Sequence, residues 1–161
     1  PTGEVFGADE RFGYRLRHLM RGRAWGQQGR PLDWKTNVAA LAVGNTRLGF
    51  ALCVPFASTL LEFVGLDSGG FHFVGASSVG KSSILRAAAS VAGRGERKDG
   101  LVLGWKGNAK GVSANAALFC DLPLILDELS RAPRKEVAAI VMDIAEGTGT
   151  LAAFIAVGRL R

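Results

Sequence analysis

Length, composition and charge limit what this chain can be. Its 161 residues suffice for one domain, or part of one, with a sizeable core. Hydrophobic residues make up 48% and charged residues 21%, as in ordinary globular proteins, which excludes a low-complexity chain. The net charge of +6 is compatible with a nucleic acid or another acidic partner, and a solvated basic face is the alternative.

The basic side chains gather in two stretches of the sequence. Residues 11–35 contain a single acid, Asp33, whereas residues 94–110 also contain Glu96 and Asp99. The basic residues of the two stretches are Arg11, Arg15, Arg17, Arg21, Arg23, Arg30 and Lys35, and then Arg94, Arg97, Lys98, Lys106 and Lys110. Such clusters are compatible with nucleic-acid binding, although composition alone does not separate this from a solvated surface.

Cysteine and histidine usage predicts a reducing compartment and no zinc site. Cys53 and Cys120 lie in apolar surroundings without C-x-x-C spacing, as buried thiols do. His18 and His72 have no neighbours at ligand spacing. No signal peptide is visible and the chain opens with Pro1, so we expect a cytoplasmic fragment of a longer protein.

The first part of the chain leads into the core. Residues 1–35 are polar, glycine-rich and basic, with an alternation at residues 12–16 that is compatible with a short strand. We interpret residues 1–35 as an entry segment and residues 36–161 as the core. Residues 33–44 predict a helix with its apolar side chains on one face.

Residues 46–66 are strongly apolar, so a membrane span must be considered. Pro55, Ser58, Thr59 and Glu62 interrupt the run, and no uncharged stretch of about 20 residues remains. We therefore interpret the segment as a buried helix that packs on a sheet, and we expect no membrane partner.

Residues 71–85 predict a strand, a phosphate-binding loop and the start of a helix. An apolar run leads into Gly-Ala-Ser-Ser-Val-Gly-Lys-Ser, the G-x-x-x-x-G-K-[ST] pattern. Gly75 and Gly80 permit a close approach of phosphate, and successive backbone N–H groups at the helix N-terminus attract the anion. Lys81 would reach the β- and γ-phosphates, and the Ser82 hydroxyl would bind Mg²⁺. The alternative is a glycine-rich turn with an incidental lysine.

We expect the whole loop and the start of its helix to contact the nucleotide. The predicted nucleotide-binding residues are Gly75, Ala76, Ser77, Ser78, Val79, Gly80, Lys81, Ser82 and Ser83.

Helices and strands alternate beyond the loop, which is typical of an α/β fold. The alanines of the first helix would let it approach a sheet closely. The expected elements are helix 81–91, strand 101–103, helix 112–120, strand 122–126 and helix 133–146, followed by a tail at 151–161 that forms a hairpin arm or one strand.

Asp127 and Glu128 follow the apolar run Leu122–Leu126 and predict the second half of a nucleotide site. An acid at the end of a buried strand would bind the Mg²⁺ that Ser82 also holds. The next residue, Glu128, would orient and deprotonate the attacking water. The length of sequence between Lys81 and Asp127 fits an ATPase in which an added strand separates the loop strand from the acidic strand. Without the loop, the same pattern would be compatible with a helix cap.

The same residues argue against other enzymes with phosphate-binding loops. The N-K-x-D motif that specifies guanine in GTPases is absent from the sequence. Small-molecule kinases generally lack a glutamate next to the strand-end aspartate. The pattern therefore favours ATP hydrolysis, with Lys81 and Glu128 as catalytic residues and Ser82 and Asp127 as metal ligands.

The order of motifs resembles the domain of unknown function 927 family, ATPases carried by integrative and other mobile elements. The motifs that carry the resemblance are Phe71–Ser82, Ala88–Val91, Trp105, Leu126–Leu129 and Ala145–Gly149. Members of the family are similar to the minichromosome-maintenance type of AAA+ helicase. The match runs over about residues 35–150.

The resemblance implies a three-layer P-loop NTPase fold of the AAA+ kind, with a parallel sheet and helices on both faces. It also implies a homo-hexameric ATPase that binds ATP and Mg²⁺ and translocates on DNA. Gly80, Lys81, Ser82, Asp127 and Glu128 would take the nucleotide-site roles. We expect the core of a DNA motor; the alternative is an ATP-dependent assembly or regulatory switch that does not unwind DNA.

Some positions depart from the family pattern. Residues 150–157 are apolar where the family usually continues with basic residues, and residues 112–114 lack a glutamate. Only three of the five strands of an AAA+ core are placed, and the sensor strand and arginine finger are expected beyond the C-terminal end. A core truncated there is expected to hydrolyse ATP weakly by itself.

Overall fold

The computed structural model describes most of the predicted core. The described residues are 24–61, 63–76, 78–105, 116, 119, 122–129, 134–145 and 154–159. The strand expected at 12–16 and most of the helix expected at 112–120 lie outside them. Glu62, Ser77 and Cys120 lie outside them too.

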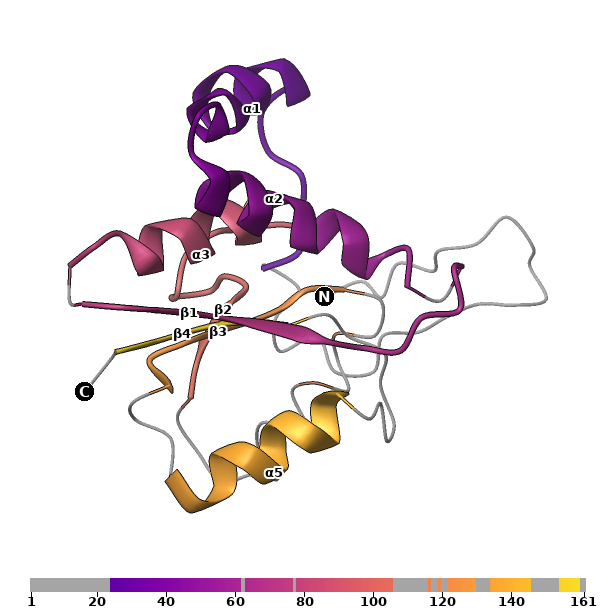
Figure 1. The fold of residues 1–161 in the computed structure, drawn as a ribbon. Helices are drawn as coiled ribbons and strands as arrows, with labels where there is room; N and C mark the ends of the chain where they lie inside the picture. Colours follow the sequence, from indigo (N-terminus) through magenta and orange to yellow (C-terminus); the bar gives the residue numbers. More distant parts are fainter. Residues whose placement is uncertain are drawn as a thin grey trace.

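Four parallel strands form one sheet in the order β1-β4-β3-β2. The strands are β1 (Gly70–Gly75), β2 (Val102–Gly104), β3 (Leu124–Asp127) and β4 (Phe154–Arg159). The tail therefore forms one strand, not a hairpin arm, and adds a fourth strand to the three placed from the sequence. In Figure 1 the four strands lie side by side across the middle of the molecule.

A strand does separate the loop strand from the acidic strand in the sheet, but it is not strand 101–103, which lies between them in the sequence and at the edge of the sheet. The separating strand is β4, which pairs with β1 on one side and with β3 on the other. Its carboxyl end lies level with that of β1, because Arg159 is in register with Gly75. Helix α5 (Arg134–Ala145) connects β3 to β4, which lets the chain return to the start of the sheet as parallel pairing requires.

Helices cover both faces of the sheet (Figure 1), with α2 and α3 on one side and α5 on the other. α2 (Thr46–Ser58) packs against α3 (Lys81–Ala89), and α3 contacts all four strands. Ala88 and Ala89 of α3 are fully buried. Their small side chains allow the close approach that the alanine-rich sequence predicted.

The helix expected over residues 33–44 is two shorter elements. α1 (Pro31–Asn37) begins with a proline, whose fixed φ suits the first helical position. The backbone leaves the α-helical path at Val38, where φ is −119°, and Ala39–Ala42 then form the 3₁₀ helix η2. α2 starts after Asn45, whose side chain accepts a hydrogen bond from the Leu48 N–H at 3.1 Å.

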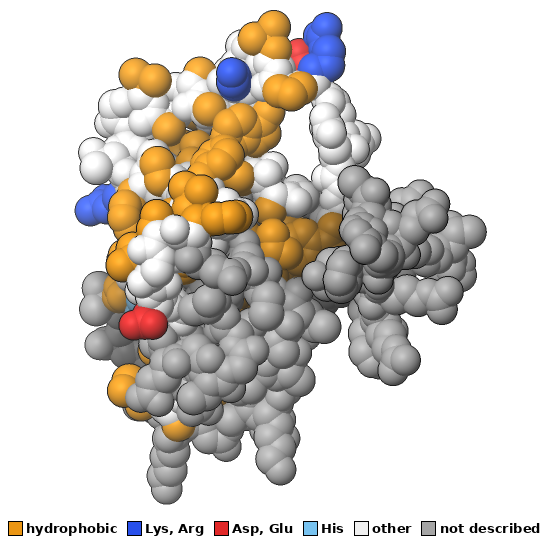
Figure 2. Space-filling view, turned by 90° about the vertical axis from the view of Figure 1, so that its right-hand side faces the viewer, with side chains coloured by type: hydrophobic (Ala, Val, Ile, Leu, Met, Phe, Trp, Pro, Cys, Tyr) orange, Lys and Arg blue, Asp and Glu red, His pale blue; other side chains and the backbone are white. Residues whose placement is uncertain are grey.

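The apolar run 46–66 is helical only as far as Ser58, and one face of α2 is buried. Among the described residues, no helix combines the length and the apolar character that a membrane crossing needs. Several large side chains beyond the buried face are exposed, and Figure 2 shows hydrophobic side chains gathered over one face of the molecule. The exposed large hydrophobic residues of α2, of the turn after it and of β1 are Phe50, Phe56, Leu60, Phe63, Val64, Leu66, Phe71 and Val74.

The loop between α3 and β2 is built on close backbone contacts at three glycines. A Cβ at Gly93 would lie 2.3 Å from the Ala24 carbonyl oxygen, and one at Gly95 would lie 2.4 Å from that of Arg86. At Gly100 the nearest atom, the Glu96 carbonyl oxygen, would be 2.0 Å away. The Leu101 N–H donates to the Arg94 carbonyl at 2.9 Å and closes the loop. The backbone of this loop therefore follows a tightly packed path.

These contacts predict that Gly93→Ala destabilises the fold by about 1–3 kcal/mol, because a methyl group has no space beside the Ala24 backbone. Chemical denaturation measures this as a lower midpoint with an unchanged slope. Gly69→Ala is the matched control, because a Cβ there meets no atom within 4 Å. Equal midpoints for the two variants would contradict the close packing of the loop.

Candidate functional site

The described part of the loop between β1 and α3 contains two residues with positive φ. Gly80 is in the left-handed region with φ +83°, directly before the first residue of α3. Ser78 also has a positive φ, +62°, which is uncommon for a residue with a side chain. A Cβ at Gly75 would touch the Val79 side chain at 3.4 Å. The loop therefore turns tightly from the edge strand into the N-terminus of α3.

The Lys81 side chain folds back over this loop. Its ammonium donates a hydrogen bond to the Gly75 carbonyl at 2.9 Å and another to the Ala76 carbonyl. The positive charge is thus held at the loop backbone, near the N–H groups of the first turn of α3. This is an arrangement that attracts anions.

The structure brings Ser82 and Asp127 together from distant parts of the sequence. The Ser82 hydroxyl lies 3.3 Å from Asp127 Oδ2, although the two residues are 45 positions apart in the sequence. All four residues of β3 are buried, and Asp127 at its carboxyl end is only 4% exposed. The acidic strand therefore ends beside the first turn of α3.

Glu128 follows Asp127 in a strained backbone conformation. Its φ is +65°, and its N–H donates to Asp127 Oδ1 at 2.8 Å. A non-glycine residue in this region costs about 1–3 kcal/mol and is common at functional sites. The conformation turns the Glu128 side chain away from the line of β3 and toward the loop after α3.

Arg97 binds both carboxylates. Its Nη2 donates to Glu128 Oε2 at 2.9 Å, and its Nη1 lies 3.8 Å from Asp127 Oδ2. The hydrogen bond that Arg97 donates to Glu128 raises the pKa of the Arg97 guanidinium, although partial burial opposes this, so Arg97 stays charged. The contact places a third charge, on the loop built around Gly93, Gly95 and Gly100, at the end of β3.

Sequence reasoning missed Arg97, which it counted only among the residues of a basic stretch. The three glycines around it were the available signal, because they indicate a tight loop between a helix and a strand. The other expected site residues are accounted for as follows. Gly75, Ala76, Ser78, Val79, Gly80, Lys81, Ser82 and Ser83 lie in or directly after the loop, Asp127 and Glu128 lie at the end of β3, and Ser77 lies outside the described residues.

A cavity of about 540 Å³ adjoins the loop. Val79, Gly80 and Ser83 line one side of it, and Val38, Leu41 and Leu48 line another. It therefore lies between the start of α3 and the helices that precede β1. Its walls are mainly apolar, and it extends along α3 from Val79 and Gly80 of the loop to Ser90.

Comparison with known proteins identifies the family. A profile of the domain of unknown function (DUF927) matches residues 4–155. The chain belongs to this family. The DUF927 membership predicted from the order of motifs is thus confirmed, and no curated protein matches the chain.

A solved structure described as "SCCmec type IV Cch - active helicase" is similar to this DUF927 chain. The TM-score is 0.64 at 22% sequence identity, and the similar region covers 86% of this chain. That region is 29% of the helicase, so this chain spans less than a third of that protein. At this identity the likeness is one of fold, and it agrees with the parallel α/β architecture described above.

Proposed function

We propose that this DUF927 chain is the ATP-binding and hydrolysing core of a helicase-like DNA motor from a mobile genetic element. The observation that carries the proposal is the contact of Ser82 with Asp127, at 3.3 Å, beside Glu128. In an open parallel sheet, ligands bind at the carboxyl ends of the strands. The loop after β1 and the acids after β3 both lie at that end.

In this proposal the loop binds the phosphates of ATP. Residues 75–83 surround them with backbone N–H groups, and Lys81 exchanges its loop carbonyls for the β- and γ-phosphate oxygens. The adjoining cavity of about 540 Å³ then receives the adenosine. Its apolar lining by Val38, Leu41 and Leu48 suits the faces of a purine ring.

The donor set also fits Mg²⁺. Two neighbouring ligands of an octahedral Mg²⁺ are about 2.9 Å apart, since each lies about 2.0–2.1 Å from the ion. Ser82 Oγ and Asp127 Oδ2 are 3.3 Å apart, so a small movement would place both in one coordination shell. Among the described residues no group of three or more His, Cys, Asp or Glu side chains forms a metal cage. Mg²⁺ does not need one, because it keeps water and phosphate ligands, and it would neutralise charge that develops on the phosphates.

Glu128 is the proposed general base. It would accept a proton from the water whose oxygen attacks the γ-phosphorus, as the bond from that phosphorus to the ADP oxygen breaks. In the present geometry its carboxylate is bound by Arg97 at 2.9 Å. A carboxylate oxygen that is engaged by a guanidinium is not available to accept a proton from water. Arg97 therefore keeps the Glu128 carboxylate from acting as a base until this ion pair breaks.

The strand order is compatible with the proposed AAA+ core of the minichromosome-maintenance kind. β4 lies between β1 and β3, and its carboxyl end is level with Gly75, so β4 is our candidate for the sensor strand that the sequence alone did not locate. The exposed hydrophobic side chains of α2 and β1 suit packing against a further strand or a neighbouring subunit of a homo-hexamer. An arginine finger would come from such a neighbour.

The proposal predicts that Lys81→Ala in the full-length protein abolishes ATP binding or lowers hydrolysis more than about 100-fold. Glu128→Gln keeps the shape of the base but not its proton affinity, so ATP binding persists while turnover falls about 100-fold or more. Steady-state hydrolysis and a nucleotide-binding assay measure both. Lys98→Ala and Glu96→Gln are matched controls on the exposed surface. Unchanged hydrolysis in Lys81→Ala and Glu128→Gln would refute the proposal.

Arg97→Ala is predicted to raise hydrolysis in the absence of DNA by up to about fivefold. The reason is that Arg97 no longer holds the Glu128 carboxylate, and a partly exposed ion pair contributes no more than about 1 kcal/mol. Steady-state hydrolysis measures the change, with Lys98→Ala from the same loop as the control. A fall to background in Arg97→Ala would instead make Arg97 a required part of the reaction.

A strand-displacement assay on the full-length protein separates a motor from a regulatory switch. A motor unwinds a tailed duplex only with ATP, and the DNA stimulates its hydrolysis less as salt rises, because phosphate contacts weaken. Glu128→Gln is the matched inactive control. Normal ATP turnover without unwinding would identify the switch instead.

A further inference from the structure

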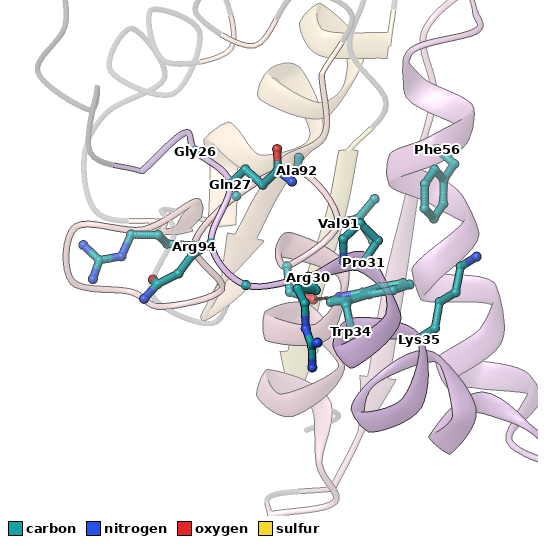
Figure 3. A pocket seen from close by; sticks show the side chains of 14 residues that line it. Gly26, Gln27, Arg30, Pro31, Trp34, Lys35, Phe56, Val91, Ala92 and Arg94 are labelled. Atoms are coloured by element: carbon teal, nitrogen blue, oxygen red, sulfur yellow. Dashed lines mark hydrogen bonds between the residues drawn. The ribbon is translucent and has the colours of Figure 1, made fainter.

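A second cavity lies at the opposite end of α3 from the phosphate loop (Figure 3). It measures about 640 Å³, within the usual range for ligand sites. Trp34 of α1 and Phe56 of α2 supply its aromatic side chains, and the segment Ser90–Arg94 closes it from the end of α3. α3 has nine residues, so its two ends are about 13 Å apart. This cavity is therefore distant from the phosphate loop, although Ser90 lines both this cavity and the one proposed for adenosine.

Trp34 is held in place at this cavity. Its indole N–H donates a hydrogen bond to Ser90 Oγ at 2.8 Å, drawn as a dashed line in Figure 3. The Ser90 hydroxyl donates in turn to the Ala87 carbonyl at 2.6 Å. The Phe56 ring meets Trp34 nearly edge-on, with centroids 6.4 Å apart and an interplanar angle of 79°. The indole is thus a preorganised flat surface, which lowers the entropic cost of binding a ligand.

The segment that closes the cavity has its backbone donors already paired. The N–H groups of residues 90–93 donate to carbonyls of the last turn of α3, and the Arg94 N–H donates to the Ala24 carbonyl at 2.9 Å. A planar, largely apolar group can therefore lie against this segment without leaving one of these N–H groups unsatisfied.

Positive charge surrounds the opening. Lys35 and Arg94 line the cavity with exposed side chains, and so does Arg30, which is paired with Asp33 at 2.9 Å. Among the described residues that line the cavity there is no carboxylate. In the sequence, residues 11–23 directly before this region contain five arginines and no acid (Arg11, Arg15, Arg17, Arg21 and Arg23). The surroundings are complementary to a polyanion.

We propose that this cavity binds an unpaired nucleotide of single-stranded nucleic acid, with the base stacked against Trp34 and the flanking phosphates contacting Lys35 and Arg94. The inference rests on the proposed action on DNA and adds the site of contact. A flat aromatic surface beside cations is the usual way in which proteins hold single strands without reading their sequence. Bases in a duplex are stacked on each other and cannot enter. An acidic peptide would use the cations but not the indole face.

The test measures binding of fluorescein-labelled oligo-dT to the full-length protein by anisotropy, without nucleotide. Trp34→Ala is expected to weaken binding about tenfold through the lost stacking. Trp34→Phe should bind nearly as wild type, because an aromatic face remains. Lys35→Ala and Arg94→Ala should each reduce the slope of log affinity against log salt by about 0.7, the value for one lost contact to a single strand. Arg47→Ala, an exposed arginine that does not line this cavity, is the matched control.

Several results would overturn the inference. These are wild-type affinity in Trp34→Ala, Lys35→Ala and Arg94→Ala, an equal loss in Arg47→Ala, equal binding of duplex DNA, or equal competition by polyglutamate. If thermal melting shows that Trp34→Ala is unfolded, the inference is judged by the salt slopes of Lys35→Ala and Arg94→Ala, and slopes equal to that of the wild type overturn it. Lys81→Ala separates this inference from the proposed function, because it should lose hydrolysis and still bind oligo-dT. Pocket variants without effect, together with an inactive Lys81→Ala, would refute the nucleic-acid site alone.

Discussion

The contact between Ser82 and Asp127 joins the first turn of α3 to the end of β3, and the rest of the site depends on it. It exists because α3 lies very close to the sheet. Leu85, Ala88 and Ala89 are fully buried at that interface, and the two alanines present only a methyl group each. A larger side chain at either alanine would move α3 outward and separate the hydroxyl from the carboxylate. Packing in the core thus sets the distance between the Ser82 hydroxyl and the Asp127 carboxylate.

The charges at the end of β3 need compensation, because Asp127 is almost fully buried and Glu128 follows it directly. A buried carboxylate is costly unless hydrogen bonds or an opposite charge offset its desolvation. The Glu128 N–H, the Ser82 hydroxyl and the Arg97 guanidinium supply these partners. Mg²⁺ would offer Asp127 a stronger partner than Arg97 does. The same geometry is therefore compatible with an arginine that exchanges places with the metal.

Much of this arrangement could be predicted because its causes are local. The pattern from Gly75 to Ser82 specifies a loop, and a buried strand ending in Asp127 can only present that carboxylate at its carboxyl end. Arg97 could not be found in this way, since its contact with Glu128 depends on a loop shape created by Gly93, Gly95 and Gly100. The position of β4 was equally hidden. The periodicity of an apolar segment can indicate a strand, but it does not show which strands of the sheet that segment pairs with.

α1 and η2 form a shared wall between the two cavities, which connects the proposed sites for ATP and for a single strand. Val38 and Leu41 line the cavity beside the loop, Trp34 and Lys35 line the other, and Ser90 of the α3 end lines both. The Trp34–Ser90 hydrogen bond at 2.8 Å fixes this wall to α3. A ligand that moves α1 against α3 in one cavity therefore changes the shape of the other. Any coupling of this kind is reciprocal by thermodynamic linkage. ATP would therefore change the affinity for single-stranded nucleic acid by the same factor as the nucleic acid changes the affinity for ATP.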